Sequence, residues 1–165
     1  MNITIEDAAR VALIGVGATA AMDLWLALLR LLGVPTLDFA MIGRWVGHWR
    51  RGAILHGAIG KAAPVKGELA LGWLVHYATG VAFAALLVAI FGVAWTRTPT
   101  LMPALGVGVA TVAAPWLLMQ PAMGAGIASS KTAAPARNRA RSLANHAVFG
   151  LGLYLSALLL AWISR

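Results

Sequence analysis

The sequence predicts an all-α integral membrane protein, a four-transmembrane-helix bundle, on the basis of three observations. Hydrophobic residues make up 61% of the 165 residues and the mean hydropathy is +0.82, whereas soluble domains are about 45–50% apolar. Four apolar stretches are long enough for a helix to cross a bilayer. None of these stretches alternates apolar and polar residues, as a half-buried strand would. A chain this apolar could not bury its surface in water, so the bilayer is its expected solvent.

The four spans are expected within a single transmembrane domain that covers residues 1–165. Thr4 and Asp7 have the spacing of a capping box, which predicts the start of the first helix. Acidic residues precede the first basic residue, so the N-terminus does not resemble a cleavable signal peptide. Pro115 predicts a kink in the third span. The predicted spans are residues 9–32, 69–93, 101–123 and 143–164.

The distribution of charge predicts the direction of the spans. The formal net charge is +8, and most basic residues lie in the loops that follow the first and third spans, whereas the opposite side carries only Arg10, Arg97 and Arg165. Loops rich in Lys and Arg stay in the cytoplasm, so both termini are expected on the outer side. This topology accounts for the basic excess, and no nucleic-acid partner is expected. The absence of cysteine excludes thiolate metal sites and cysteine nucleophiles.

Residues 38–51, "DFAMIGRWVGHWRR", predict a short amphipathic cytoplasmic helix. Its apolar residues recur at helical spacing, and basic residues take most of the other positions. Such helices lie in the membrane interface, with tryptophans at headgroup depth and arginines on anionic lipid. A binding site for a soluble-side partner is the alternative. The candidate lipid-headgroup residues are Arg44, Trp45, Trp49, Arg50 and Arg51.

Spans one and three, and spans two and four, resemble each other. The first pair contains "GVGATAAMDLWL" and "GVGVATVAAPWL", and the second shares the pattern small-x-x-x-His-x-x-x-Gly around His76 and His146. A duplicated helical hairpin and a chance resemblance between apolar helices both remain open. In either case, small residues four apart let helix backbones approach closely. Both imidazoles are therefore expected to face other helices.

Asp23, His76 and His146 are the main candidates for a functional site. An ionised aspartate at the centre of a bilayer costs at least about 2.5–3.5 kcal/mol, so Asp23 needs a partner or a proton. The two histidines are its natural partners, and such a cluster would titrate as a coupled unit. Gln120 and Asn145 lie at similar depths and extend the proposed ligand or proton site. No nucleophile and base occur at a recognisable spacing, so no catalytic residue is assigned and an enzyme is not the favoured interpretation.

Several functions are compatible with these residues. The favoured one is a binding or transport protein with a buried Asp–His–His proton or ligand site. In a second, His76 and His146 ligate a haem b, or join Asp23 in holding a divalent metal in a redox protein. A third is a lipid-interacting assembly or scaffold protein that acts through its basic loops. A role in helix packing alone is the plainest alternative, and glycines left unpacked in the bundle would allow a homodimer.

Four stretches of the chain resemble a known family. They are "MDLWLALLRLLGVPTLDFAMIGRWVGH", "GELALGWLVHYATG", "PWLLMQPAMGAGIASSKT" and "RSLANHAVFGLGLYLSALLLA". They are similar to small bacterial inner-membrane proteins grouped as domain of unknown function 2938. The resemblance covers nearly the whole chain and implies a bacterial inner-membrane protein with about four helices. It implies no activity, ligand or site residue.

Overall fold

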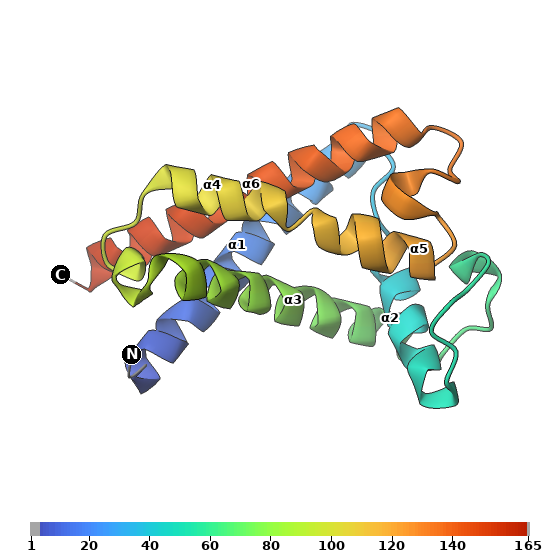
Figure 1. Ribbon diagram of the computed structural model, residues 1–165, viewed down its shortest axis with the longest axis horizontal. Helices are drawn as coiled ribbons and strands as arrows, with labels where there is room; N and C mark the ends of the chain where they lie inside the picture. Colours follow the sequence, from blue (N-terminus) through green and yellow to red (C-terminus); the bar gives the residue numbers. More distant parts are fainter. Residues whose placement is uncertain (1–3, 165) are drawn as a thin grey trace. The chain divides into compact units, whose positions relative to one another are not determined.

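The computed structural model describes residues 4–164, which form helices joined by turns and short loops (Figure 1). No strand occurs among these residues, so the predicted all-α fold is confirmed for them. Arg165, counted above with the outer charges, lies outside the described residues. The helices are α1 (Ile5–Leu31), α2 (Phe39–His48), α3 (Glu68–Phe91), α4 (Leu101–Ala110), α5 (Gln120–Ala122) and α6 (Pro135–Ile163). The shorter helical turns are η1 (Trp49–Arg51), η2 (Ile59–Lys61), η3 (Val93–Thr96), η4 (Pro115–Met119) and η5 (Ile127–Ser129).

Four helical segments within residues 4–164 are long and apolar enough to cross a membrane. They are Ile5–Leu31, Glu68–Phe91, Leu101–Ala122 and Pro135–Ile163, which correspond in order to the predicted spans. Their length and composition suggest a multi-pass membrane protein. The fourth helix begins before the predicted residue 143, because Pro135 is well suited to a first helical turn. Hydropathy marks the apolar part of this helix, whereas its backbone begins in the polar segment ahead of it.

The third segment is interrupted at the predicted proline. α4 ends at Ala110, a turn follows, and η4 is π-helical from Pro115 to Met119. Proline lacks an N–H and its ring crowds the preceding turn. In membrane helices, local π-helical geometry can provide new partners for the backbone groups that a proline leaves without a hydrogen bond. The sequence therefore predicted the place of the interruption, and the structure adds its form.

α1 begins with the predicted capping box. The hydroxyl of Thr4 accepts a hydrogen bond from the Asp7 N–H at 3.1 Å, and the Thr4 N–H donates to the Asp7 carboxylate at 3.1 Å. Arg97 reaches the same carboxylate at 2.8 Å, and Arg10 donates to the Ser164 hydroxyl at 3.0 Å. These contacts join the start of α1 to the α3–α4 connection and to the end of α6.

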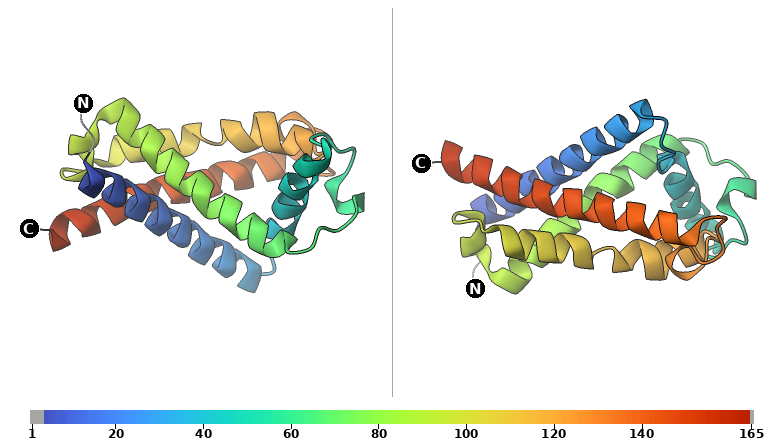
Figure 2. Two further views of the ribbon diagram at one scale, coloured as in Figure 1. Left: turned by 90° about the horizontal axis from the view of Figure 1, so that it is seen from below. Right: turned by 90° about the horizontal axis from the view of Figure 1, so that it is seen from above.

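Two compact units can be distinguished in the chain. Among the described residues, the first unit comprises 4–35, 77–111 and 144–164. Its helices meet at glycines. A Cβ atom on Gly15 would lie 2.6 Å from the Cα of Val81, and one on Gly152 would lie 2.9 Å from the Cα of Ala18. Figure 2 shows α1 crossing α3 and α4 running beside α6. The core of this unit consists of Ile14, Ala18, Ala84, Leu87, Trp95, Ala104, Val107, Phe149, Leu153 and Ala157.

The second unit comprises residues 36–76 and 112–143. In it, α2 packs against the first turns of α3 through Gly43 and Gly72. A Cβ atom on either glycine would overlap a backbone oxygen of the other helix. The loop after η1 is tied to the segment around Met123 by backbone hydrogen bonds. The His56 N–H donates to the Ala122 carbonyl at 2.8 Å, and the Ile59 N–H donates to the Met123 carbonyl at 3.0 Å.

Candidate functional site

Asp23 lies on α1, eight residues before its last residue, Leu31. Its carboxylate accepts a hydrogen bond of 2.9 Å from the hydroxyl of Tyr77 on α3. Both residues belong to the first unit. Tyr77 was not among the site residues predicted from the sequence. The available signal was a tyrosine within an apolar span, because its hydroxyl must find a partner where water is absent.

A second interhelical hydrogen bond lies two residues further along α1. The indole N–H of Trp25 donates to the side-chain oxygen of Asn145 on α6 at 3.0 Å. Asn145 was predicted as a site residue, whereas Trp25 was not. The bond joins α1 to α6 and satisfies a tryptophan donor that would be costly to leave unpaired in hydrocarbon.

His146, the residue after Asn145, joins α6 to the end of α4. Its Nδ1 lies 3.0 Å from the hydroxyl of Thr111 and 3.2 Å from the carbonyl of Gly108. The Thr111 hydroxyl donates its only hydrogen to the Gly108 carbonyl at 2.6 Å. The hydrogen-bond pattern therefore assigns the proton to His146 Nδ1, which donates to both oxygens. This tautomer leaves the lone pair on Nε2.

These three contacts lie close together along the helices of the first unit. Asp23 and Trp25 are two residues apart, which is about 3 Å along a helix axis, and Asn145 is adjacent to His146. The contacts join α3 to α1, α1 to α6, and α6 to the residue that caps α4. We call this set the polar belt: Tyr77, Asp23, Trp25, Asn145, His146 and Thr111.

The other two predicted site residues belong to the second unit. The His76 ring packs against two aromatic rings, with centroid distances of 4.4 Å to Phe39 and 5.9 Å to Trp73. The side-chain oxygen of Gln120 accepts a hydrogen bond from the Ser129 hydroxyl at 3.1 Å. The predicted residues are therefore divided, with Asp23, Asn145 and His146 in one unit and His76 and Gln120 in the other.

The hypothesis of a metal site with three protein ligands gains no ligand set from these positions. No three His, Asp or Glu side chains within residues 4–164 come close enough together to hold a metal ion.

The predicted lipid-headgroup residues fall into two groups, with Trp45, which is partly buried, between them. Arg44 is buried, and its guanidinium donates to the two carboxylate oxygens of Glu68 at 2.7 and 2.8 Å. This hydrogen bonding raises the pKa of Arg44 above its usual value, so the arginine stays charged. Arg44 thus holds α2 to the start of α3. Trp49, Arg50 and Arg51 are exposed instead, at the end of α2.

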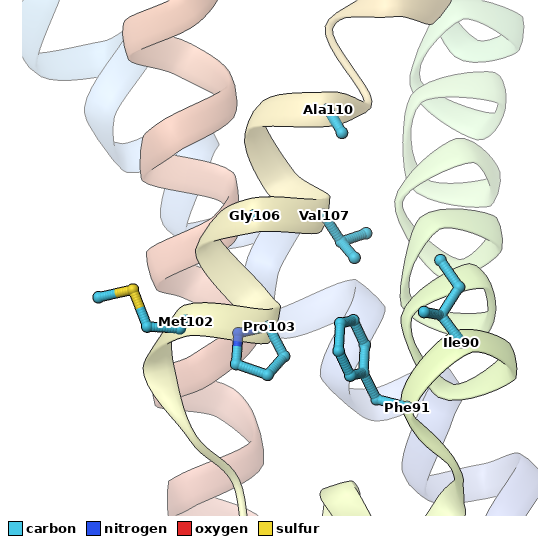
Figure 3. Close-up of a pocket in the computed structure, with 7 residues that line it drawn as sticks. All are labelled: Ile90, Phe91, Met102, Pro103, Gly106, Val107 and Ala110. Carbon is cyan, nitrogen blue, oxygen red and sulfur yellow. The ribbon is translucent and has the colours of Figure 1, made fainter.

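A groove in the first unit is lined by residues other than those of the polar belt (Figure 3). Side chains from the end of α3 face side chains of α4 across it, and every residue that lines it is apolar. None of the belt residues takes part, so this groove is separate from the candidate site. Its lining residues are Ile90, Phe91, Met102, Pro103, Gly106, Val107 and Ala110.

A protein-family model matches most of the chain. The model of a family described as "Protein of unknown function (DUF2938)" matches residues 12–160. No curated protein and no solved structure matches the chain. The matched range contains all six residues of the polar belt.

Proposed function

We propose that this chain, which belongs to the family of unknown function DUF2938, is a small inner-membrane protein that binds or carries protons at its polar belt. The observation that carries the proposal is the set of three side-chain hydrogen bonds that join four apolar helices within the belt. Ionisable side chains within membrane helices are costly and commonly mark ion paths and proton relays. Asp23 and His146 supply a carboxyl and an imidazole, the two groups most used in such relays.

The hydrogen bonds of the belt allow both groups to change protonation without releasing a helix. The Tyr77 hydroxyl donates to Asp23, and it can do so whether the carboxyl is ionised or protonated, with the stronger bond to the ionised form. His146 donates from Nδ1, so a proton can join or leave at Nε2. Protons can therefore enter and leave the belt while the contacts between helices persist, which suits a carrier or relay.

The proposal includes a direction in the membrane. The two basic loops lie in the cytoplasm and both termini face the periplasm of a bacterial cell, as the charge distribution predicts. In this orientation Asp23 lies nearer the cytoplasmic end of α1 than its outer end.

The experiment is a proton-flux measurement on the purified protein in liposomes that contain a pH-sensitive dye. A pH step in the presence of valinomycin should produce proton uptake with the wild-type protein, and Asp23→Asn should reduce it to the level of empty liposomes. His146→Gln should slow it. Glu6→Gln is the matched control, because it removes a carboxylate that lies outside the belt on a side chain that is 69% exposed.

Two results would overturn the proposal. One is a wild-type protein that gives no flux above empty liposomes. The other is an Asp23→Asn protein that retains the wild-type rate while eluting as a folded species in detergent. The second result would leave the belt as a set of helix-packing contacts.

A further inference from the structure

The segment at the end of α2 exposes large apolar side chains beside arginines. Trp49 is 46% exposed, Ile54 54% and Leu55 79%. Arg50 and Arg51 lie between them and are also exposed. Neither arginine has an ion-pair partner among residues 4–164. We call residues 49–55 the exposed turn.

The exposed turn is held in place by specific contacts within the second unit. The indole N–H of Trp45 donates to the Ile54 carbonyl at 2.8 Å. Nδ1 of His48 lies 2.8 Å from Nε2 of His56, and Nε2 of His48 lies 3.0 Å from the Ala63 carbonyl. The turn is therefore fixed on both sides, and its apolar side chains are presented outward by the fold rather than by disorder.

The surroundings of the exposed turn are cationic. The sequence from Phe39 to Gly67 contains no Asp or Glu, and it contains three arginines and two lysines. Arg44 is neutralised by Glu68, which leaves four basic side chains unopposed by any acid in this loop. A protein partner for this surface would need a strongly acidic face, whereas an anionic bilayer supplies that charge everywhere on its surface.

The membrane also lies within reach of the loop. The loop connects α1 to α3, and both helices are long and apolar enough to cross a bilayer. The ring of Trp49 contacts that of Trp45 edge-on at 4.9 Å between centroids. Tryptophan, aliphatic and arginine side chains in one short segment are typical of peripheral elements that enter the headgroup region.

We propose that the exposed turn binds the surface of an anionic phospholipid bilayer. Ile54 and Leu55 enter the boundary between headgroups and acyl chains, and Arg50 and Arg51 bind lipid phosphates. The hydrogen bonds from Trp45 and His48 position the turn for this contact. The surface is separate from the polar belt and needs no proton movement, so it can be tested independently of the proposed function.

The test uses the absence of cysteine from the chain. Leu55→Cys and, as the matched control, Ala133→Cys each provide one site for an environment-sensitive nitrobenzoxadiazole label. Ala133 is also exposed, in the loop that precedes α6. The labelled proteins are placed in vesicles of phosphatidylcholine alone and of phosphatidylcholine mixed with about one third phosphatidylglycerol. Quenching by lipids with a doxyl group near the headgroup reports contact with the interface.

In the mixed vesicles, the label at position 55 should be quenched at least about twice as strongly as the label at position 133. The difference should fall to the phosphatidylcholine level when Arg50→Gln and Arg51→Gln are combined. It should persist when Lys131→Gln and Arg137→Gln are combined, which removes the same charge from another loop.

Three results would overturn the proposal. The first is equal lipid quenching at positions 55 and 133. The second is quenching at position 55 that does not depend on phosphatidylglycerol or on the two arginines. The third is a label at position 55 that is shielded from aqueous iodide but not quenched by the lipids, which would show that protein covers the turn.

Discussion

In the first unit helix backbones meet at glycines around an apolar core, whereas in the second unit a glycine contact between α2 and α3 is reinforced by an ion pair and by hydrogen-bonded loops. Gly15 and Gly152 bring α1 into contact with α3 and α6. In the second unit, Arg44 binds Glu68, and backbone N–H groups of the loop bind carbonyls near Met123.

This difference follows from the kind of chain in each unit. Apolar helices satisfy their own backbone and gain little from the hydrophobic effect in lipid, so close packing decides how they associate. A loop has backbone groups without intrahelical partners, and these groups must be paired when they are buried. The polar belt departs from this pattern in the first unit, as do the contacts of Arg97 with Asp7 and of Arg10 with Ser164, because they add specific hydrogen bonds to helices that otherwise associate by shape.

The largest expected effect is at Gly43, where the backbones of α2 and α3 approach each other closely. A Cβ atom there would overlap the backbone oxygen of Glu68, which cannot rotate away. We expect Gly43→Ala to lower the free energy of unfolding by about 3 kcal/mol, near the upper end for overpacking. Chemical unfolding in mixed micelles measures it. Gly106→Ala is the control, since nothing lies within 4 Å of a Cβ atom there. Equal behaviour of the two variants would contradict the close approach of α2 and α3.

Leu153 tests how far packing alone holds the first unit. Its side chain is fully buried, whereas Leu155 on the same helix is 50% exposed. We expect Leu153→Ala to lower the free energy of unfolding by about 2 kcal/mol, at the low end for a buried leucine. The value is low because the lipid reference state is as apolar as the core, so mainly the cavity contributes. Leu155→Ala should have little effect in the same assay, and a comparable loss in both would argue against the assigned core.

Glu68 tests the ion pair of the second unit. Glu68→Gln leaves the buried guanidinium of Arg44 without a carboxylate, and it weakens the bond that the Val65 N–H donates to the same side chain at 2.9 Å. We expect Glu68→Gln to lower the Tm. The decrease should be smaller than the decrease in Tm that Leu153→Ala causes, because the Glu68 side chain remains 17% exposed. Combining Arg44→Met with Glu68→Met should restore part of the loss, because no unpaired charge remains. Glu6→Gln is the control, since that side chain is 69% exposed. A Tm as low for the double variant as for Glu68→Gln would count against the ion pair.

The smallest expected effect concerns the polar belt. A double-mutant cycle of Trp25→Phe and Asn145→Ala should give a coupling energy of about 0.6–1 kcal/mol, the size usual for a hydrogen bond between membrane helices. A coupling energy near zero would mean that the two side chains do not bond across α1 and α6. The cycle thereby separates the structural contribution of the belt from its proposed role with protons.

Several features of the fold could be predicted because their causes are local. Thr4 and Asp7 are three residues apart and cap one helix turn. Pro115 lies within an apolar span, and a proline inside a helix interrupts its backbone hydrogen bonds. The site was predicted less completely. Asp23, Asn145 and His146 were identified because polar residues are unusual in apolar helices. Tyr77 was missed because the histidines were taken as the partners of Asp23. Asp23 and Tyr77 are 54 residues apart, and nothing in the spacing of either helix specifies which faces meet.

The sequence by itself determined that the chain is helical, that four segments are apolar enough to span a membrane, and in which order they occur. These properties depend on composition and on residues within a few positions of each other. Only the tertiary structure decided that Phe39 and Ile42 are buried on the amphipathic segment while Ile54 and Leu55 are exposed. It also decided which polar side chains form the belt. The physical reason is that helical periodicity defines a face, but the surface that covers this face depends on where glycines let other backbones approach.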